Sequence, residues 1–117
     1  MNEEPWNIVY YESARGDKLI EEFINTLQEK TQIKVIRSIE LLKKYGIRLG
    51  PPHIKKIRNT SLWEIRILGS DNIRVFYVTQ IERTFLILHI FKKKTQKTEI
   101  QEINTAIKRL NNYKFVI

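Results

Sequence analysis

The sequence has no cysteine, only two histidines and only three prolines. Without cysteine the chain can form no disulfide, no thiolate zinc site and no cysteine nucleophile. The histidines, His53 and His89, are distant in the chain, and neither has acidic residues clustered beside it. A Gly-rich phosphate loop and a His-x-x-x-His pair are also absent. These absences predict no metal site and no bound cofactor, and they argue against a Ser-His-Asp hydrolase.

Long apolar runs and targeting segments are absent as well. No window approaches the roughly 18 apolar residues of a membrane span, and the acidic N-terminus lacks the apolar core of a secretory signal. No low-complexity tract, repeat or linker divides the chain, and 117 residues suit one hydrophobic core. We therefore expect a single domain over residues 1–117, in the cytoplasm and not at a membrane.

Charge is abundant and unevenly distributed. The net charge is +8, yet residues 1–45 hold seven Lys/Arg against eight Asp/Glu, whereas residues 46–117 hold fourteen against five. A basic half of this kind points to a polyanionic partner, most often a nucleic acid. The alternative is a solvated basic surface without a specific partner.

Two periodicities divide the chain into helices and strands. Helical spacing of apolar residues is found in 19–27, in a stripe formed by Ile33, Ile36, Ile39 and Leu42, and in 100–110. The first two segments predict a helical hairpin, with Thr31 as an N-cap and Gly46 after the second helix. Strand-like segments are 8–11, 62–67, 74–79 and 85–91, with a short strand expected near Ile57.

The strand segments have distinct faces. In 62–67, Trp63 and Ile65 lie on one face, and Glu64 and Arg66 lie on the other. Segment 85–91 is apolar on both faces, as in a central strand, and the short connections predict an antiparallel meander. The element order predicts an α+β domain. We expect an antiparallel sheet of about four strands, packed on one side against an N-terminal helical hairpin and a C-terminal helix.

Cations follow these strands. If the strands pair in order, Arg66, Arg74 and the lysines that end the segment 85–91 converge on one region of the sheet. Such a cluster would stabilise the doubly charged phosphorane formed when an RNA 2′-hydroxyl attacks its own phosphate. Glu64, His89 or a lysine kept neutral by neighbouring cations could accept the 2′-proton. The structural alternatives are a charged strand face, a hydrogen-bonded core histidine and a solvated lysine run.

Three segments carry a family resemblance. They are Leu62-Trp63-Glu64-Ile65-Arg66, Arg74-Val75-Phe76-Tyr77 and the run from Leu88 to Thr98, followed by Glu102-Ile103 and Ala106. Together they resemble the phage-derived HigB-like branch of the RelE/ParE toxins. The family pattern has tyrosine where Ile73 stands and proline where Glu99 stands. The resemblance covers about residues 6–113, and its specific part is 62–106.

The resemblance implies a RelE-like, microbial-RNase-like fold and metal-free cleavage of messenger RNA on the ribosome. It implies a type II toxin with a cognate antitoxin, often a helix-turn-helix protein like HigA. The expected catalytic residues are Arg66, Arg74, Lys93, Lys94, Glu64 and His89. The expected RNA-binding residues are Lys55, Lys56, Arg58, Lys92 and Lys97. Two alternatives remain: a ParE-like inhibitor of DNA gyrase without nuclease activity, and an inactive relative that only binds RNA or antitoxin.

Overall fold

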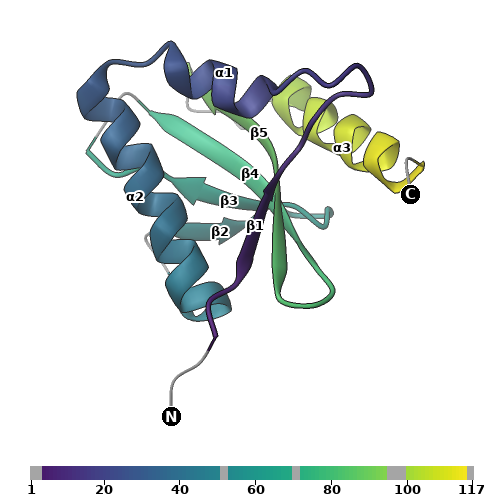
Figure 1. Ribbon diagram of the computed structural model, residues 1–117, viewed down its shortest axis with the longest axis horizontal. Helices are drawn as coiled ribbons and strands as arrows, with labels where there is room; N and C mark the ends of the chain where they lie inside the picture. Colours follow the sequence, from purple (N-terminus) through teal and green to yellow (C-terminus); the bar gives the residue numbers. More distant parts are fainter. Residues whose placement is uncertain (1–3, 51–52, 70–71, 95–99, 116–117) are drawn as a thin grey trace.

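In the part of the chain that the structure describes, a mixed sheet of five strands forms the middle layer (Figure 1). This computed structural model describes residues 4–50, 53–69, 72–94 and 100–115, of which the side chains of 114 and 115 are not described. Within these ranges the strands are β1 (Asn7–Tyr10), β2 (Ile54–Lys56), β3 (Trp63–Arg66), β4 (Ile73–Gln80) and β5 (Thr84–Lys92). The helices are α1 (Leu19–Asn25), α2 (Glu29–Tyr45), the 3-10 turn η1 (Gly46–Arg48) and α3 (Ile100–Phe115).

The strand order is β1-β5-β4-β3-β2. The predicted meander of β3, β4 and β5 is confirmed, and β2 adds to it as an antiparallel edge strand. The expectation of about four antiparallel strands is wrong, because β1 pairs in parallel with β5 as a fifth strand. Tight turns force neighbouring strands to be antiparallel. Two helices separate β1 from β2, so no tight turn sets the direction of β1.

Helices cover both faces of the sheet, which corrects the expectation that all of them pack on one side. The core between the sheet and α1 and α2 contains Ile24, Ile39 and Ile87, whereas Leu86, Leu88 and residues of α3 form the core on the opposite face. Figure 1 shows α3 on the far side of the sheet from α2. The strand β5 is buried on both faces, as the sequence predicts. We call the two sides of the sheet the α2 face and the α3 face.

Helix α2 is longer than expected and differently oriented. It begins at Glu29, so Thr31 is a buried first-turn residue and not the N-cap. Its buried stripe is Thr31, Val35, Ile39 and Leu42, while Ile33 and Ile36 are 47% and 51% exposed. Ile33, Ile36, Ile39 and Leu42 recur every third residue and spread over about 180° of the helix surface, whereas Thr31, Val35, Ile39 and Leu42 lie within about 80°. Only the second set can face the sheet as one stripe. Within the described part of the chain, no helix combines the length and apolar character needed to span a bilayer.

Candidate active site

Strands β3 and β4 bring the sequence-predicted Glu64, Arg66 and Arg74 onto the α3 face. Arg66 lies directly opposite Arg74, and Glu64 lies opposite Phe76. Phe76 belongs to the core on the α3 face, so Glu64 and, two residues on, Arg66 project to that side. Two like charges directly opposite each other normally destabilise a sheet. The pair Arg66–Arg74 therefore requires a compensating group or a function.

Glu64 supplies the compensation for Arg74. The Nε atom of Arg74 lies 3.0 Å from Oε1 of Glu64, with side-chain exposures of 8% and 12%. The N–H of Nε is not directed at that oxygen, so charge and not an aligned hydrogen bond holds this pair. Nη1 of Arg74 donates to the carbonyl of Ile73 at 3.2 Å. In this conformation Glu64 is the partner of Arg74, and neither group is open to solvent.

Arg66 is the exposed cation of the cluster. Within the described part of the chain no carboxylate pairs with it, and Lys55, which lies opposite Glu64 on β2, is exposed nearby. Lys55, Arg66 and Arg74 face one carboxylate, that of Glu64, which leaves a surplus of two positive charges. A strand-borne cation with uncompensated charge is well suited to bind a phosphate, since the sheet holds its backbone in place.

The other expected cations are dispersed. Lys92 lies opposite Ile73, on the α2 face. Lys56 lies on the same face, with its Nζ atom 5.2 Å from the ring centroid of the half-buried Trp63. Arg58 is exposed in the turn between β2 and β3. Lys93 and Lys94 follow β5; the backbone of Lys93 donates to the carbonyl of Asn72, and Lys94 is exposed. Lys97 lies outside the described residues.

A bulge in β5 determines where His89 points. Phe76 pairs with His89 but Tyr77 pairs with Ile87, so Leu88 is an extra residue on β5. With strict alternation His89 would follow Ile87 onto the α2 face. The bulge turns His89 to the α3 face instead, where its ring stacks on Phe91 with centroids 5.3 Å apart.

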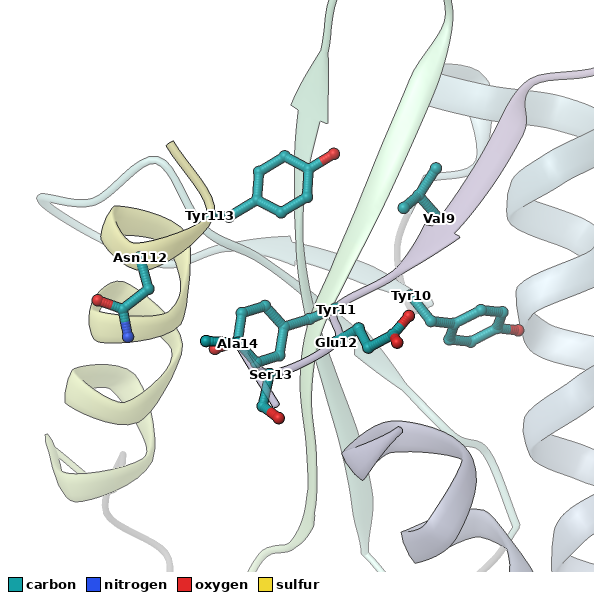
Figure 2. A pocket seen from close by; sticks show the side chains of 8 residues that line it. All are labelled: Val9, Tyr10, Tyr11, Glu12, Ser13, Ala14, Asn112 and Tyr113. Carbon is teal, nitrogen blue, oxygen red and sulfur yellow. The ribbon is translucent and has the colours of Figure 1, made fainter. Parts of the chain in front are cut away.

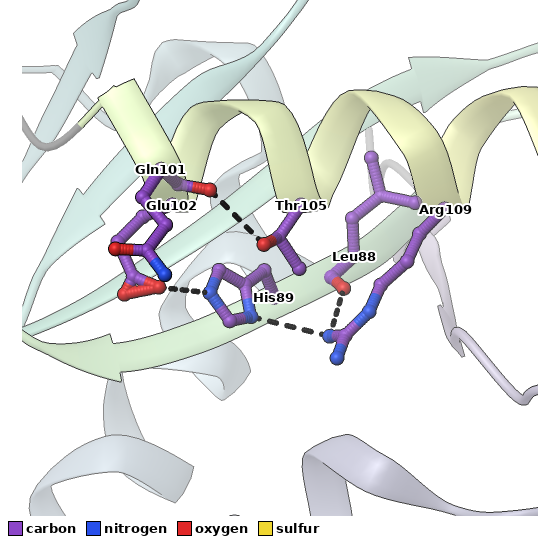
Figure 3. A network of polar contacts seen from close by, with 6 residues as sticks. All are labelled: Leu88, His89, Gln101, Glu102, Thr105 and Arg109. Carbon is purple, nitrogen blue, oxygen red and sulfur yellow. Dashed lines mark hydrogen bonds and ion pairs between the residues drawn. The ribbon is translucent and has the colours of Figure 1, made fainter.

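Two residues of α3 hold both nitrogens of His89 (Figure 3). Nε2 lies 2.9 Å from Oε1 of Glu102, and Nδ1 lies 3.1 Å from Nη1 of Arg109, which also donates to the carbonyl of Leu88 at 3.0 Å. An arginine has donors only, so Nδ1 accepts and the ring proton lies on Nε2, which donates to Glu102. The guanidinium of Arg109 also lies 5.5 Å from the ring centroid of Tyr11.

Burial favours the neutral form of this imidazole. Burial is the main cause that lowers the pKa of His89 below its usual 6.5; Arg109 lowers it further, and Glu102 opposes both. The pKa of Arg109 is also lowered, chiefly by burial. Glu102 and Arg109 were not among the sequence-predicted site residues. Two sequence signals could have pointed to them: Glu102 belongs to the segment that resembles the family pattern, and the spacing of seven residues places the two side chains two turns apart on one helix face.

A separate cavity of about 370 Å³ lies between the end of β1 and the C-terminal part of α3. Figure 2 shows the side chains around it, among them Val9, Tyr11, Asn112 and Tyr113. The described residues that line it include no lysine or arginine. The cavity is therefore unsuited to phosphate and does not belong to the basic cluster on β3 and β4. Among the described residues, no three His, Asp or Glu side chains gather where they could hold a metal ion.

A comparison with protein families places the chain in a family. A model of the phage-derived Gp49-like proteins (DUF891) matches residues 22–111. The match spans most of the chain, so the chain belongs to the phage-derived Gp49-like family, which is part of the RelE/HigB-like toxins. No curated protein matches the sequence.

Proposed function

We propose that the chain is the toxin of a type II toxin–antitoxin system and cleaves messenger RNA on the ribosome without a metal. The observation that carries this proposal is the exposed Arg66, held on β3 opposite the buried Arg74. Family membership supports the toxin role. Fixed cations stabilise the developing charge of a phosphorane without reorganising during the reaction.

The cations divide into two roles in this proposal. Arg66 binds the scissile phosphate, with Lys93 or Lys94 as a second contact from the end of β5. Arg74 supports the site through its ion pair with Glu64; the side chain of Arg74 is 8% exposed and that of Glu64 is 12% exposed. The ribosome positions the substrate, which replaces part of the binding surface that a larger nuclease would need. The proposed partner is a helix-turn-helix antitoxin that covers the basic surface in the cytoplasm.

Induction of the chain in growing bacteria tests the proposal. New RNA 5′ ends should appear only while translation is active, and cleavage by purified chain on translating ribosomes should persist when zinc and manganese are chelated. Arg66→Ala should lower cleavage by roughly 100-fold or more, with the melting temperature unchanged because Arg66 is exposed.

The matched control is Arg37→Ala, which removes an exposed cation from α2 in the opposite layer. It should cleave as fast as the native chain. Full cleavage by Arg66→Ala would refute the site. Growth arrest with intact transcripts and trapped gyrase–DNA complexes would instead establish the ParE-like alternative.

A further inference from the structure

The proposed cleavage needs a group that accepts the 2′-proton, and the arrangement of the sheet removes one candidate. Glu64 is paired with Arg74 at 3.0 Å and is 12% exposed. The carboxylate is already engaged as the counter-charge of the buried Arg74 and has little surface open to a 2′-hydroxyl. Glu64 is therefore poorly placed to accept the proton.

The arrangement around His89 removes the second candidate. The lone pair of its Nδ1 accepts a hydrogen bond from Arg109, which can only donate. Its Nε2 carries the ring proton and donates it in a hydrogen bond to Glu102. The ring is also enclosed by Phe76 and Phe91 on its own sheet face. His89 thus has no free lone pair to accept a proton.

Glu102 is the group with acceptor capacity left. A carboxylate has about four acceptor positions, and the bond from His89 uses one of them. The side chain of Glu102 is 22% exposed against 12% for His89, so the carboxylate is the open end of the network. Figure 3 shows Glu102 in the first turns of α3, beyond the ring of His89. The charged groups nearest the ring are Glu102 and Arg109 of α3, then Arg74 on the neighbouring strand β4 and its partner Glu64 on β3.

We propose that Glu102 is the general base of this site and that His89 and Arg109 are positioning residues that aim its carboxylate. The inference rests on the nuclease function proposed above. Phe91 lies opposite Arg74, so His89 is two residues along β5 from the position opposite Arg74. Arg66 lies opposite Arg74 on the other side, one strand further from His89. With strands about 4.8 Å apart, the Cα atoms of Arg66 and His89 are roughly 12 Å apart. An arginine side chain, a phosphate and a carboxylate together span that distance.

The step is a transesterification within the RNA. The 2′-oxygen forms a bond to phosphorus as its proton passes to the carboxylate of Glu102, and the bond from phosphorus to the 5′-oxygen breaks. That oxygen takes a proton from water. The products are a 2′,3′-cyclic phosphate and a 5′-hydroxyl, and Glu102 returns its proton to solvent.

Single-turnover cleavage of a defined messenger RNA on translating ribosomes tests this role. The native rate should fall in acid as the base becomes protonated. Glu102→Gln should lower the rate by about 100-fold or more and abolish this acid dependence. Glu102→Ala should regain part of its rate when formate is added, since formate can occupy the vacated position. Glu82→Gln, at the exposed β4–β5 turn, is the charge-matched control and should cleave normally.

Two outcomes separate the inference from the proposed function. A native chain that cleaves no RNA contradicts the nuclease proposal itself. A native chain that cleaves, together with a Glu102→Gln variant that keeps the rate and its acid dependence, overturns only the role of Glu102. Should Glu102→Gln unfold, Glu102→Asp retains the charge but withdraws the carboxylate by one methylene. A folded Glu102→Asp with the native rate would equally overturn the role.

Discussion

The side chain of His89 shows how a single residue depends on its neighbours. Its two nitrogens are fixed by opposite chemistry, a carboxylate on one side and a guanidinium on the other. The environment that keeps the ring neutral also defines which nitrogen bears the proton. A lone histidine in an apolar strand can therefore organise a site without itself transferring a proton.

Replacements on α3 should move the pKa of His89 in opposite directions. Arg109→Met removes a cation that lowers this pKa and should raise it; Glu102→Gln removes a partner that raises it and should lower it. NMR titration of the ring protons in both variants and in the native chain measures the shifts. Equal shifts in both variants, or none, would contradict the hydrogen-bond pattern around the ring.

The same lowered pKa links stability to pH. The pKa of His89 is lower in the folded chain than in the unfolded chain, where it lies near 6.5, so the folded chain binds the second ring proton less tightly. The unfolded state therefore binds more protons as the pH falls below that value, and the free energy of unfolding decreases. Because the stabilisation is present above pH 6.5, denaturant unfolding at pH 7.5 and 5.5 should show this loss, and Arg109→Met should reduce it.

The junction between α2 and η1 depends on one glycine. Gly46 has φ 58° and ψ −138°, a backbone conformation that glycine adopts most readily. A Cβ there would collide with the ring of Trp6, with Cδ1 and Cε2 only 2.8 Å away, and this ring stacks on Phe85 at 4.3 Å. The end of α2, the N-terminal segment and the sheet therefore meet at a position that has no room for a side chain.

Gly46→Ala should destabilise the chain by about 2 kcal/mol or more, since backbone strain of 1–3 kcal/mol adds to displacement of Trp6. Chemical denaturation followed by tryptophan fluorescence measures the change. Gly50→Ala is the matched control, because its Cβ would meet nothing within 4 Å. It should alter the free energy of unfolding by less than about 1 kcal/mol. A Gly46→Ala variant as stable as the control would contradict the close contact with Trp6.

At the scale of the whole molecule, charge is divided between the two layers. The α3 face carries exposed Lys55 and Arg66, and Arg58 lies in the adjacent turn. Exposed cations also occur on α2, but there Glu29 and Glu40 lie among them. The net charge of +8 attracts any polyanion, whereas the distribution over the two faces decides where it binds.

Two triple variants of equal net charge separate the effect of the net charge from the effect of its distribution over the two faces. Replacing Lys55, Arg58 and Arg66 by glutamine, or Lys30, Arg37 and Lys44 by glutamine, lowers the net charge from +8 to +5 in both cases. Binding to a single-stranded RNA should weaken with salt, and the first variant should reduce the slope of log K against log salt by about 2, at 0.7 per lost contact. The second should leave the slope nearly unchanged. Equal slopes would show that RNA binds no particular face.

The sequence by itself determined the local structure and the cations on β3 and β4. Alternation along 62–67 placed Glu64 and Arg66 on one face, and the register confirms it, because period 2 is a local property of a strand. It could not show that β1 pairs in parallel with β5, since no tight turn constrains that contact. The prediction that Ile33 belongs to the buried stripe of α2 was wrong, because a spacing of three residues drifts around a helix of 3.6 residues per turn, whereas Val35 stays in line with Ile39 and Leu42.

Tertiary structure alone decided the arrangement of the candidate site. The bulge at Leu88 reverses the side of the sheet on which His89 projects, and no local sequence pattern predicts this bulge. Glu102 and Arg109 reach His89 only because α3 packs on the face opposite α2. Burial then pairs Glu64 with Arg74 and leaves Arg66 exposed, although alternation treats the three as equivalent polar residues. Desolvation depends on which groups surround a side chain in space, and that is set by packing between elements distant in the chain.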